Sequence, residues 1–194
     1  MWSTKTELRK SMLQKRNALS KPAISRRSKL IQKIIIGSSK FRNALAVGAY
    51  FAVGSEVKTD NIVMEALRNR KILLLPRIEG EEILFYQILC TKNQLTKGRF
   101  GLIEPSPSLS SHALQKIDLL LVPGIAFDHN GYRLGHGRGY YDRFMAKKQF
   151  DFSIGLAFSF QILNHTIPHT PVDQKVDCVA TEKTMLLCQH EQIS

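Results

Sequence analysis

The chain has 194 residues, of which 43% are hydrophobic, and its formal net charge is +12. This length and composition are typical of a globular protein with one sizeable core. No apolar run approaches the roughly 18 residues that cross a bilayer, and the N-terminus lacks the hydrophobic core of a secretory signal. Three cysteines without metal-site or disulfide spacing favour reduced thiols. We therefore expect a cytoplasmic protein that does not bind membranes.

The positive charge is concentrated at the N-terminal end of the sequence. Residues 1–42 hold twelve of the 28 Lys and Arg residues but only one acid, Glu7. Such a basic segment binds nucleic acid, a membrane surface or a small polyanion, or forms solvated helix faces. A nucleic-acid-binding protein is therefore one alternative. Nucleic-acid binding would need aromatic side chains that stack on bases, and this segment offers only Trp2 and Phe41.

Helical segments alternate with short apolar strands along the sequence. Helices are expected over residues 4–18, 20–36, 59–69, 139–148 and 159–164. Strands are expected over residues 44–51, 71–75, 83–89, 117–122, 152–158, 176–180 and 184–188, with a largely irregular segment over 94–111. This alternation predicts an α/β fold, a single three-layer domain (1–194) with a mostly parallel sheet and helices on both faces.

Polar residues that follow predicted strands mark a ligand-binding rim. Ligands of parallel sheets bind beyond the carboxyl ends of the strands. Glu56 follows the strand over 44–51, and Arg77 follows a strand that we expect Pro76 to end. Both are expected to share one rim with the loop over 124–138.

The most informative stretch comes directly after the strand over 117–122. It reads PGIAFD at 123–128 and GYRLGHGRGYYD at 131–142. Alternate glycines let backbone N–H groups surround an anion, while Arg133 and Arg138 add positive charge. Asp142 offers an oxygen ligand of the kind Mg²⁺ accepts. The segment predicts a nucleotide-phosphate site with its metal, although its spacing fits neither a Rossmann motif nor a P-loop. The alternative is a solvated glycine-rich turn with structural arginines.

This segment resembles the signature of the 5-formyltetrahydrofolate cyclo-ligases, also called methenyltetrahydrofolate synthetases. Further similarities follow in the family's order, namely Lys5 with Arg9, EVKT at 56–59, LPR at 75–77, GLIEP at 101–105 and VDQKVD at 172–177. The resemblance implies a fold like that of the sugar-phosphate isomerases and CoA-transferases. It also implies an ATP-dependent cyclisation of 5-formyltetrahydrofolate to 5,10-methenyltetrahydrofolate, through a phosphorylated formyl (iminium phosphate) intermediate, with release of ADP and phosphate.

The same resemblance implies roles for individual residues, which we list by ligand. Those expected to bind ATP are Lys5, Arg9, Arg133, Leu134, Gly135, His136, Gly137, Arg138, Gly139, Tyr140 and Tyr141. Those expected to bind the folate are Phe51, Glu56, His136, Gly137, Arg138, Gly139 and Tyr140. Catalytic roles fall to Arg133, Arg138 and Tyr140, and Mg²⁺ ligation to Asp142 and Asp173, with Asp177 as the alternative to Asp173.

Simpler interpretations stay open for several of these residues. Lys5 and Arg9 could be ordinary surface charges, and Glu56 an acid of the turn that follows its strand. His136 stands where the family often has arginine, and Arg138 where it often has lysine or glycine, so the charge that meets the γ-phosphate is open. A relative of the isomerases and transferases that uses no ATP is a third alternative. The expected partners are ATP and reduced folate, without nucleic acid or membrane, and the expected state is a monomer.

Overall fold

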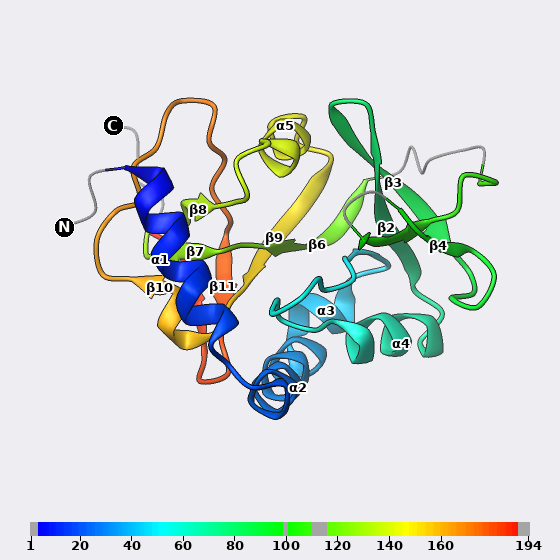
Figure 1. Cartoon of the computed structure of the whole chain (residues 1–194). Coiled ribbons are helices and arrows are strands. Elements are labelled where there is room, and N and C mark those ends of the chain that lie inside the picture. Colours follow the sequence, from blue (N-terminus) through cyan, green and yellow to red (C-terminus); the bar gives the residue numbers. More distant parts are fainter. Residues whose placement is uncertain (1–3, 99–100, 110–115, 190–194) are drawn as a thin grey trace.

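A seven-stranded mixed sheet forms the centre of the protein in the computed structural model, which describes residues 4–98, 101–109 and 116–189 (Figure 1). The strand order is β12-β11-β9-β6-β1-β2-β3. The five inner strands pair in parallel, and only the two outer strands are antiparallel to their neighbours. The expected mostly parallel sheet is confirmed. Its strands are β1 (Ala46–Gly48), β2 (Ile72–Glu79), β3 (Glu82–Ile88), β6 (Ile117–Pro123), β9 (Phe150–Leu156), β11 (Cys178–Ala180) and β12 (Met185–Leu187).

Helices cover both faces of this sheet, as expected. Side chains alternate between the faces of a strand, and β6 shows both sides. Leu119 and Leu121 belong to one core and Leu120 to the other. One face carries α2 (Lys21–Gly37), α3 (Ser39–Asn43) and α4 (Asp60–Arg68), and the other carries α5 (Tyr140–Ala146) (Figure 1). Within the described ranges, no helix is both long and apolar enough to cross a membrane.

The first helix, α1 (Lys5–Asn17), packs beside the central sheet on a second, smaller one. This sheet has the order β10-β7-β8, and its strands are β7 (Ala126–Asp128), β8 (Arg133–Leu134) and β10 (Ile162–Leu163). Leu8 and Met12 of α1 are buried against it. The sequence did not predict these strands, because two or three residues give no readable periodicity. The helix expected over 159–164 is only a 3₁₀ turn, Ser159–Gln161.

Pro76 does not end its strand, so that expectation is wrong. β2 continues to Glu79, and Pro76 lies opposite Phe85 of β3. β1 pairs with β2 only as far as Leu74, so a residue without an N–H is tolerated beyond that point. Because side chains alternate along the continued strand, Arg77 points away from the predicted rim and bonds to Glu79 instead.

A β-hairpin replaces part of the segment that was expected to be irregular. Strands β4 (Leu95–Lys97) and β5 (Ile103–Pro105) pair antiparallel, and β5 packs against β2. The end of that segment, 110–111, lies outside the described residues. The hairpin matters for function because it forms one wall of the cavity described next.

Candidate active site

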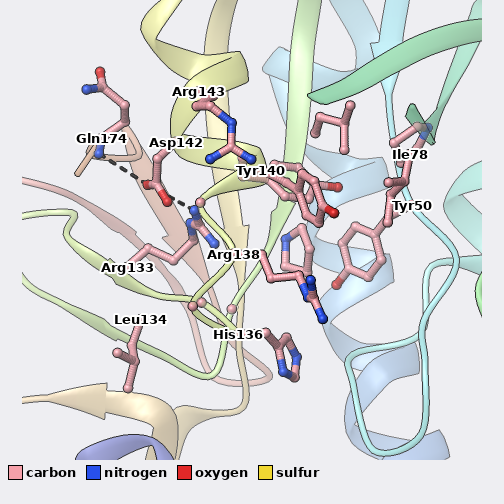
Figure 2. Close-up of a pocket in the computed structure, with 18 of the residues that line it drawn as sticks. Tyr50, Ile78, Arg133, Leu134, His136, Arg138, Tyr140, Asp142, Arg143 and Gln174 are labelled. Carbon is pink, nitrogen blue, oxygen red and sulfur yellow. Dashed lines mark hydrogen bonds and ion pairs between the residues drawn. The ribbon is translucent and has the colours of Figure 1, made fainter. Parts of the chain in front are cut away.

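A cavity of about 970 Å³ opens at the carboxyl ends of β1 and β6, where ligands of parallel sheets bind (Figure 2). Its walls come from α1, the segment after β1, the strands β2 and β3, the hairpin, the glycine-rich loop with α5, and residues 171–174. Every residue expected to bind ATP, folate or Mg²⁺ lines this one cavity. Arg77 and Asp177 do not line it.

Helix α1 brings two cations to the cavity. Lys5 and Arg9 lie one turn apart on the same face of α1 as Leu8 and Met12, and both line the cavity beside the small sheet. The Nε of Arg9 donates to the carbonyl oxygen of Gly135 at 2.9 Å. The Nζ of Lys5 lies 2.8 and 2.7 Å from the two carboxylate oxygens of Asp173. Both cations are thus tied to the cavity wall and are not ordinary surface charges.

The loop over 135–139 depends on its glycines. Gly137 and Gly139 have φ of 95° and 67°, a left-handed backbone that favours glycine. At Gly135 a Cβ would lie 2.7 Å from a guanidinium nitrogen of Arg133. Between these glycines, Arg138 extends from the loop into the cavity beside Tyr140 (Figure 2). The loop therefore exposes both backbone and an arginine to the cavity.

Arg133 and Asp142 form an ion pair beneath this loop. Their Nη2 and Oδ1 atoms are 3.0 Å apart, and the arginine side chain is only 5% exposed. The same Oδ1 accepts the backbone N–H of Gln174 at 3.3 Å (Figure 2). Arg133 also lies over the ring of Tyr141, with its Cζ 5.5 Å from the ring centre. Asp142 thereby fixes Arg133 as a positive charge behind the glycine loop.

Asp173 and Asp177, the two candidate metal ligands near the C-terminal end, have different surroundings. Asp173 lines the cavity and accepts hydrogen bonds from both the N–H and the hydroxyl of Thr170. Burial acts to raise the pKa of Asp173, but the bonds from Lys5 and Thr170 outweigh it and lower that pKa. Asp177 instead bonds to Ser153 of β9, away from the cavity. The position of Asp173 therefore favours it over Asp177 as the metal-facing carboxylate.

The carboxylates of the cavity suit a magnesium ion that is bound jointly with phosphates. Among the described residues, no group of three or more His, Cys, Asp or Glu side chains converges as a metal site. Mg²⁺ often keeps several waters and uses one or two carboxylates together with substrate phosphates. Asp142 uses only Oδ1 in its described hydrogen bonds, so Oδ2 is available for such a role. Asp142 therefore fits an ion that arrives with a nucleotide, whereas Asp173 faces the same cavity with both oxygens bonded to Lys5 or Thr170.

Glu56 closes its own turn and also faces the glycine loop. Its Oε2 accepts the N–H of Val53 at 3.0 Å, while Oε1 lies 3.5 Å from Nε2 of His136. A buried arginine that the sequence analysis missed supports this turn. Arg16 of α1 donates to Ser55 at 3.1 Å and to the carbonyl of Gly124 at 3.3 Å, and burial lowers its pKa. The turn-acid and ligand interpretations of Glu56 are thus compatible.

Buried Tyr50 and partly buried Tyr141, whose hydroxyl oxygen is buried, keep their hydroxyl protons in the cavity wall. Burial raises the pKa of Tyr50 and of Tyr141, and the charge of Glu56 adds to both shifts. The hydroxyl of Tyr50 donates to the carbonyl of Val57 at 3.1 Å. The hydroxyl of Tyr141 has no hydrogen-bond partner within the described ranges. Tyr141 is therefore a buried donor next to the cavity.

Three buried polar atoms have no hydrogen-bond partner among the described residues, and all three belong to cavity residues. They are the Tyr141 hydroxyl, Nε of Arg133 and Oε2 of Glu104. Because buried polar groups are nearly always hydrogen-bonded, unpaired ones at a cavity point to a ligand. No local pattern marks Glu104 as a ligand residue, although the GLIEP segment at 101–105 contains it.

These features define an α/β protein whose ligand cavity is bordered by a cationic, glycine-rich loop. Residues 2–182 match the sequence pattern of the 5-formyltetrahydrofolate cyclo-ligase family. The chain is 31% identical to a probable 5-formyltetrahydrofolate cyclo-ligase of Caenorhabditis elegans over 92% of each protein. It is 29% identical to the 5-formyltetrahydrofolate cyclo-ligase of Mus musculus over 93% of this chain and 94% of that one.

A solved structure agrees with these sequence relatives. The NMR structure of 5,10-methenyltetrahydrofolate synthetase from Aquifex aeolicus is similar with a TM-score of 0.83 and 34% identity. The similarity covers 98% of this chain and 95% of that one. The chain belongs to the 5-formyltetrahydrofolate cyclo-ligase family, and it is accordingly an enzyme of the ligase type. The resemblance noted in its sequence is confirmed.

Proposed function

We propose that the protein catalyses the ATP-dependent conversion of 5-formyltetrahydrofolate to 5,10-methenyltetrahydrofolate, with release of ADP and phosphate. One observation carries the proposal. The residues that the family resemblance links to ATP, folate and Mg²⁺ meet in a single cavity, although Lys5 and Asp173 are 168 positions apart in the sequence. Such convergence is what a two-substrate reaction requires, because the two reacting groups must be held together.

The cationic side of the cavity suits the phosphates of ATP. Phosphoryl transfer depends mainly on positioning and on neutralising charge. Arg133, fixed by Asp142, supplies a static positive charge, while Arg138 lies on the exposed loop and reaches the transferred phosphoryl group. Arg9 lies beside Gly137 and holds the loop through Gly135, so it couples α1 to the triphosphate site.

The part of the cavity that combines apolar side chains with carboxylates suits the reduced folate. Phe51 and the isoleucines at 78 and 83 provide apolar surface for a flat ring, and Glu56 accepts its N–H groups. The formyl oxygen attacks the γ-phosphorus as the bond to the β-phosphate oxygen breaks, and ADP leaves with that electron pair. N10 then attacks the formyl carbon and loses its proton, and inorganic phosphate leaves with the C–O electron pair. The donor groups of Arg138 and Tyr140 are suited to the charge that develops on the phosphoryl oxygens.

Asp142 and Asp173 would hold Mg²⁺ in the proposed site. When bound, the ion neutralises charge on the ATP phosphates. The protein's own contribution is to hold these carboxylates at the cavity, Asp142 through Arg133 and Asp173 through Lys5 and Thr170. Both carboxylates keep a defined position before any nucleotide arrives.

A turnover measurement tests the proposal. Purified protein with Mg-ATP and 5-formyltetrahydrofolate is expected to form the methenyl product, seen as a rise in near-ultraviolet absorbance, with one ADP for each product. Omission of ATP is expected to abolish the rise. A folded protein that gives no product at several pH values and with several divalent metals would contradict the proposal. Product formation without ATP would instead favour a relative of the isomerases and transferases.

A further inference from the structure

Glu104 is a buried carboxylate that the proposed reaction does not yet use. It lies on β5, in the hairpin wall of the cavity, and is 8% exposed. In the described part of the chain its Oε2 has no hydrogen-bond partner, and no Lys, Arg or His lies within ion-pair distance. Burying a carboxylate without partners is unfavourable. A ligand with N–H donors would remove that penalty.

The hairpin is shaped to hold this carboxylate. A Cβ at Gly98 would lie 1.8 Å from Oε1 of Glu104 and 2.0 Å from its Cδ. The carboxylate therefore occupies space that any side chain at position 98 would fill. Gly98 also donates its N–H to the carbonyl of Leu102 at 2.8 Å, which closes the hairpin around Glu104. The position of the carboxylate is thus set by the local backbone and not by a cation.

The surroundings of Glu104 are suited to a flat, nitrogen-rich ring and not to phosphate. Its neighbours Leu102 and Ile103 line the cavity, as do Ile78 and Ile83 of the adjacent strands. The cations near the glycine loop pair with other groups, Lys5 with Asp173 and Arg133 with Asp142. An anionic phosphate would be repelled by Glu104, whereas ring N–H groups are attracted.

We propose that Glu104 is a substrate-binding residue whose carboxylate accepts hydrogen bonds from the N–H groups of the folate pterin ring. This inference rests on the proposed function. The pterin carries an exocyclic amine next to a ring N–H, and these two adjacent donors match the two oxygens of one carboxylate. The adenine of ATP also carries an exocyclic amine, but its neighbouring ring nitrogens are acceptors that a carboxylate repels. Val53 uses one oxygen of Glu56, which leaves the other for a single ring N–H, whereas Glu104 offers both oxygens to the adjacent pair of donors.

Substitution of Glu104 by glutamine separates the two substrates. Glu104→Gln keeps the shape but turns one acceptor oxygen into a donor. We expect the KM for 5-formyltetrahydrofolate, and its Kd from calorimetry without ATP, to rise about tenfold or more. The KM for ATP is expected to change less than about twofold. Glu65→Gln, on the surface of α4, is the matched control and should change neither value.

Thermal unfolding distinguishes a binding role from a structural one. Because Oε2 of the unliganded carboxylate lacks a hydrogen-bond partner among the described residues, Glu104→Gln should leave the melting temperature unchanged or raise it. Gly98→Ala is a second test, since it keeps Glu104 but displaces its carboxylate. It is expected to weaken folate binding in the same selective way. The double variant should then be no weaker than the more affected single variant, because both remove one interaction.

Three other results would each contradict the assignment of Glu104 to folate binding. A rise confined to the KM for ATP would assign the carboxylate to adenine. Unchanged affinity for both substrates, or a lowered melting temperature, would make Glu104 a structural residue. If the unmodified protein neither binds 5-formyltetrahydrofolate nor converts it, the proposed function fails first, and the assignment of Glu104 fails with it.

Discussion

The four carboxylates of the cavity fall into two pairs with different partners. Asp142 and Asp173 each lie within 3.0 Å of a cation, Arg133 and Lys5 respectively. Glu56 and Glu104 have no Lys or Arg at ion-pair distance in the described ranges, and Glu56 faces only His136, at 3.5 Å. The first pair lies with the glycine loop and α1, and the second with the segment after β1 and the hairpin.

This difference is what the two proposed substrates, which are chemically unlike, require of one cavity. A carboxylate that is neutralised by a cation holds that cation in place and leaves a local balance of charge suited to phosphates and Mg²⁺. A carboxylate without a cation keeps its acceptor capacity for a ligand. We therefore expect substitutions in the first pair to change stability and nucleotide use. Substitutions in the second pair should change folate affinity.

The largest expected effect is at the buried ion pair. Asp142→Ala leaves Arg133 buried without its carboxylate, which should lower the free energy of unfolding by about 3 kcal/mol. Denaturant unfolding measures this loss, and activity with Mg-ATP should fall severely as well. Replacing Arg133 by Met in the same chain should recover part of the stability but not the activity. Unchanged stability in Asp142→Ala would show that the ion pair does not anchor the loop.

A smaller effect is expected at Arg9, which bonds to a backbone carbonyl of the glycine loop. Arg9→Ala removes the bond to Gly135 and a positive charge beside the loop, so the KM for ATP should rise about tenfold. Arg26→Ala, on the exposed face of α2, is the control within the same basic segment and should leave that KM unchanged. Equal effects, together with nucleic-acid binding that weakens steeply with salt, would favour a diffuse basic surface instead.

The smallest expected effect is the pH dependence of the pair between Lys5 and Asp173. The folded state lowers the pKa of Asp173 below its ordinary value of 3.8. The stabilisation is therefore complete well above pH 3.8 and is lost as the pH falls through the lowered pKa. Asp173→Asn should reduce stability by about 1 kcal/mol or less at pH 7. The difference should disappear in strong acid, and a difference that persists there would contradict this account.

The amino-acid sequence by itself determined the order of the seven central-sheet strands and of helices α1, α2, α4 and α5, and it marked the glycine-rich loop. The helix start at Ser20 follows a local rule, because its side chain accepts the N–H of Ala23, and the long apolar strand over 117–122 needs no partner to be recognised. The glycine spacing in GYRLGHGRGYYD carries the family assignment, because those backbone angles depend on the glycines themselves. Such signals lie within a few residues of one another.

Tertiary structure decided which charges pair and which stay available. Lys5 meets Asp173 only because α1 packs on the small sheet, whose strands are too short to be predicted. Pro76 continues a strand because β1 has already ended, and the continued strand supports the hairpin that carries Glu104. These outcomes depend on contacts between segments far apart in the chain. Local propensity does not encode such contacts, because packing and burial are properties of the assembled core.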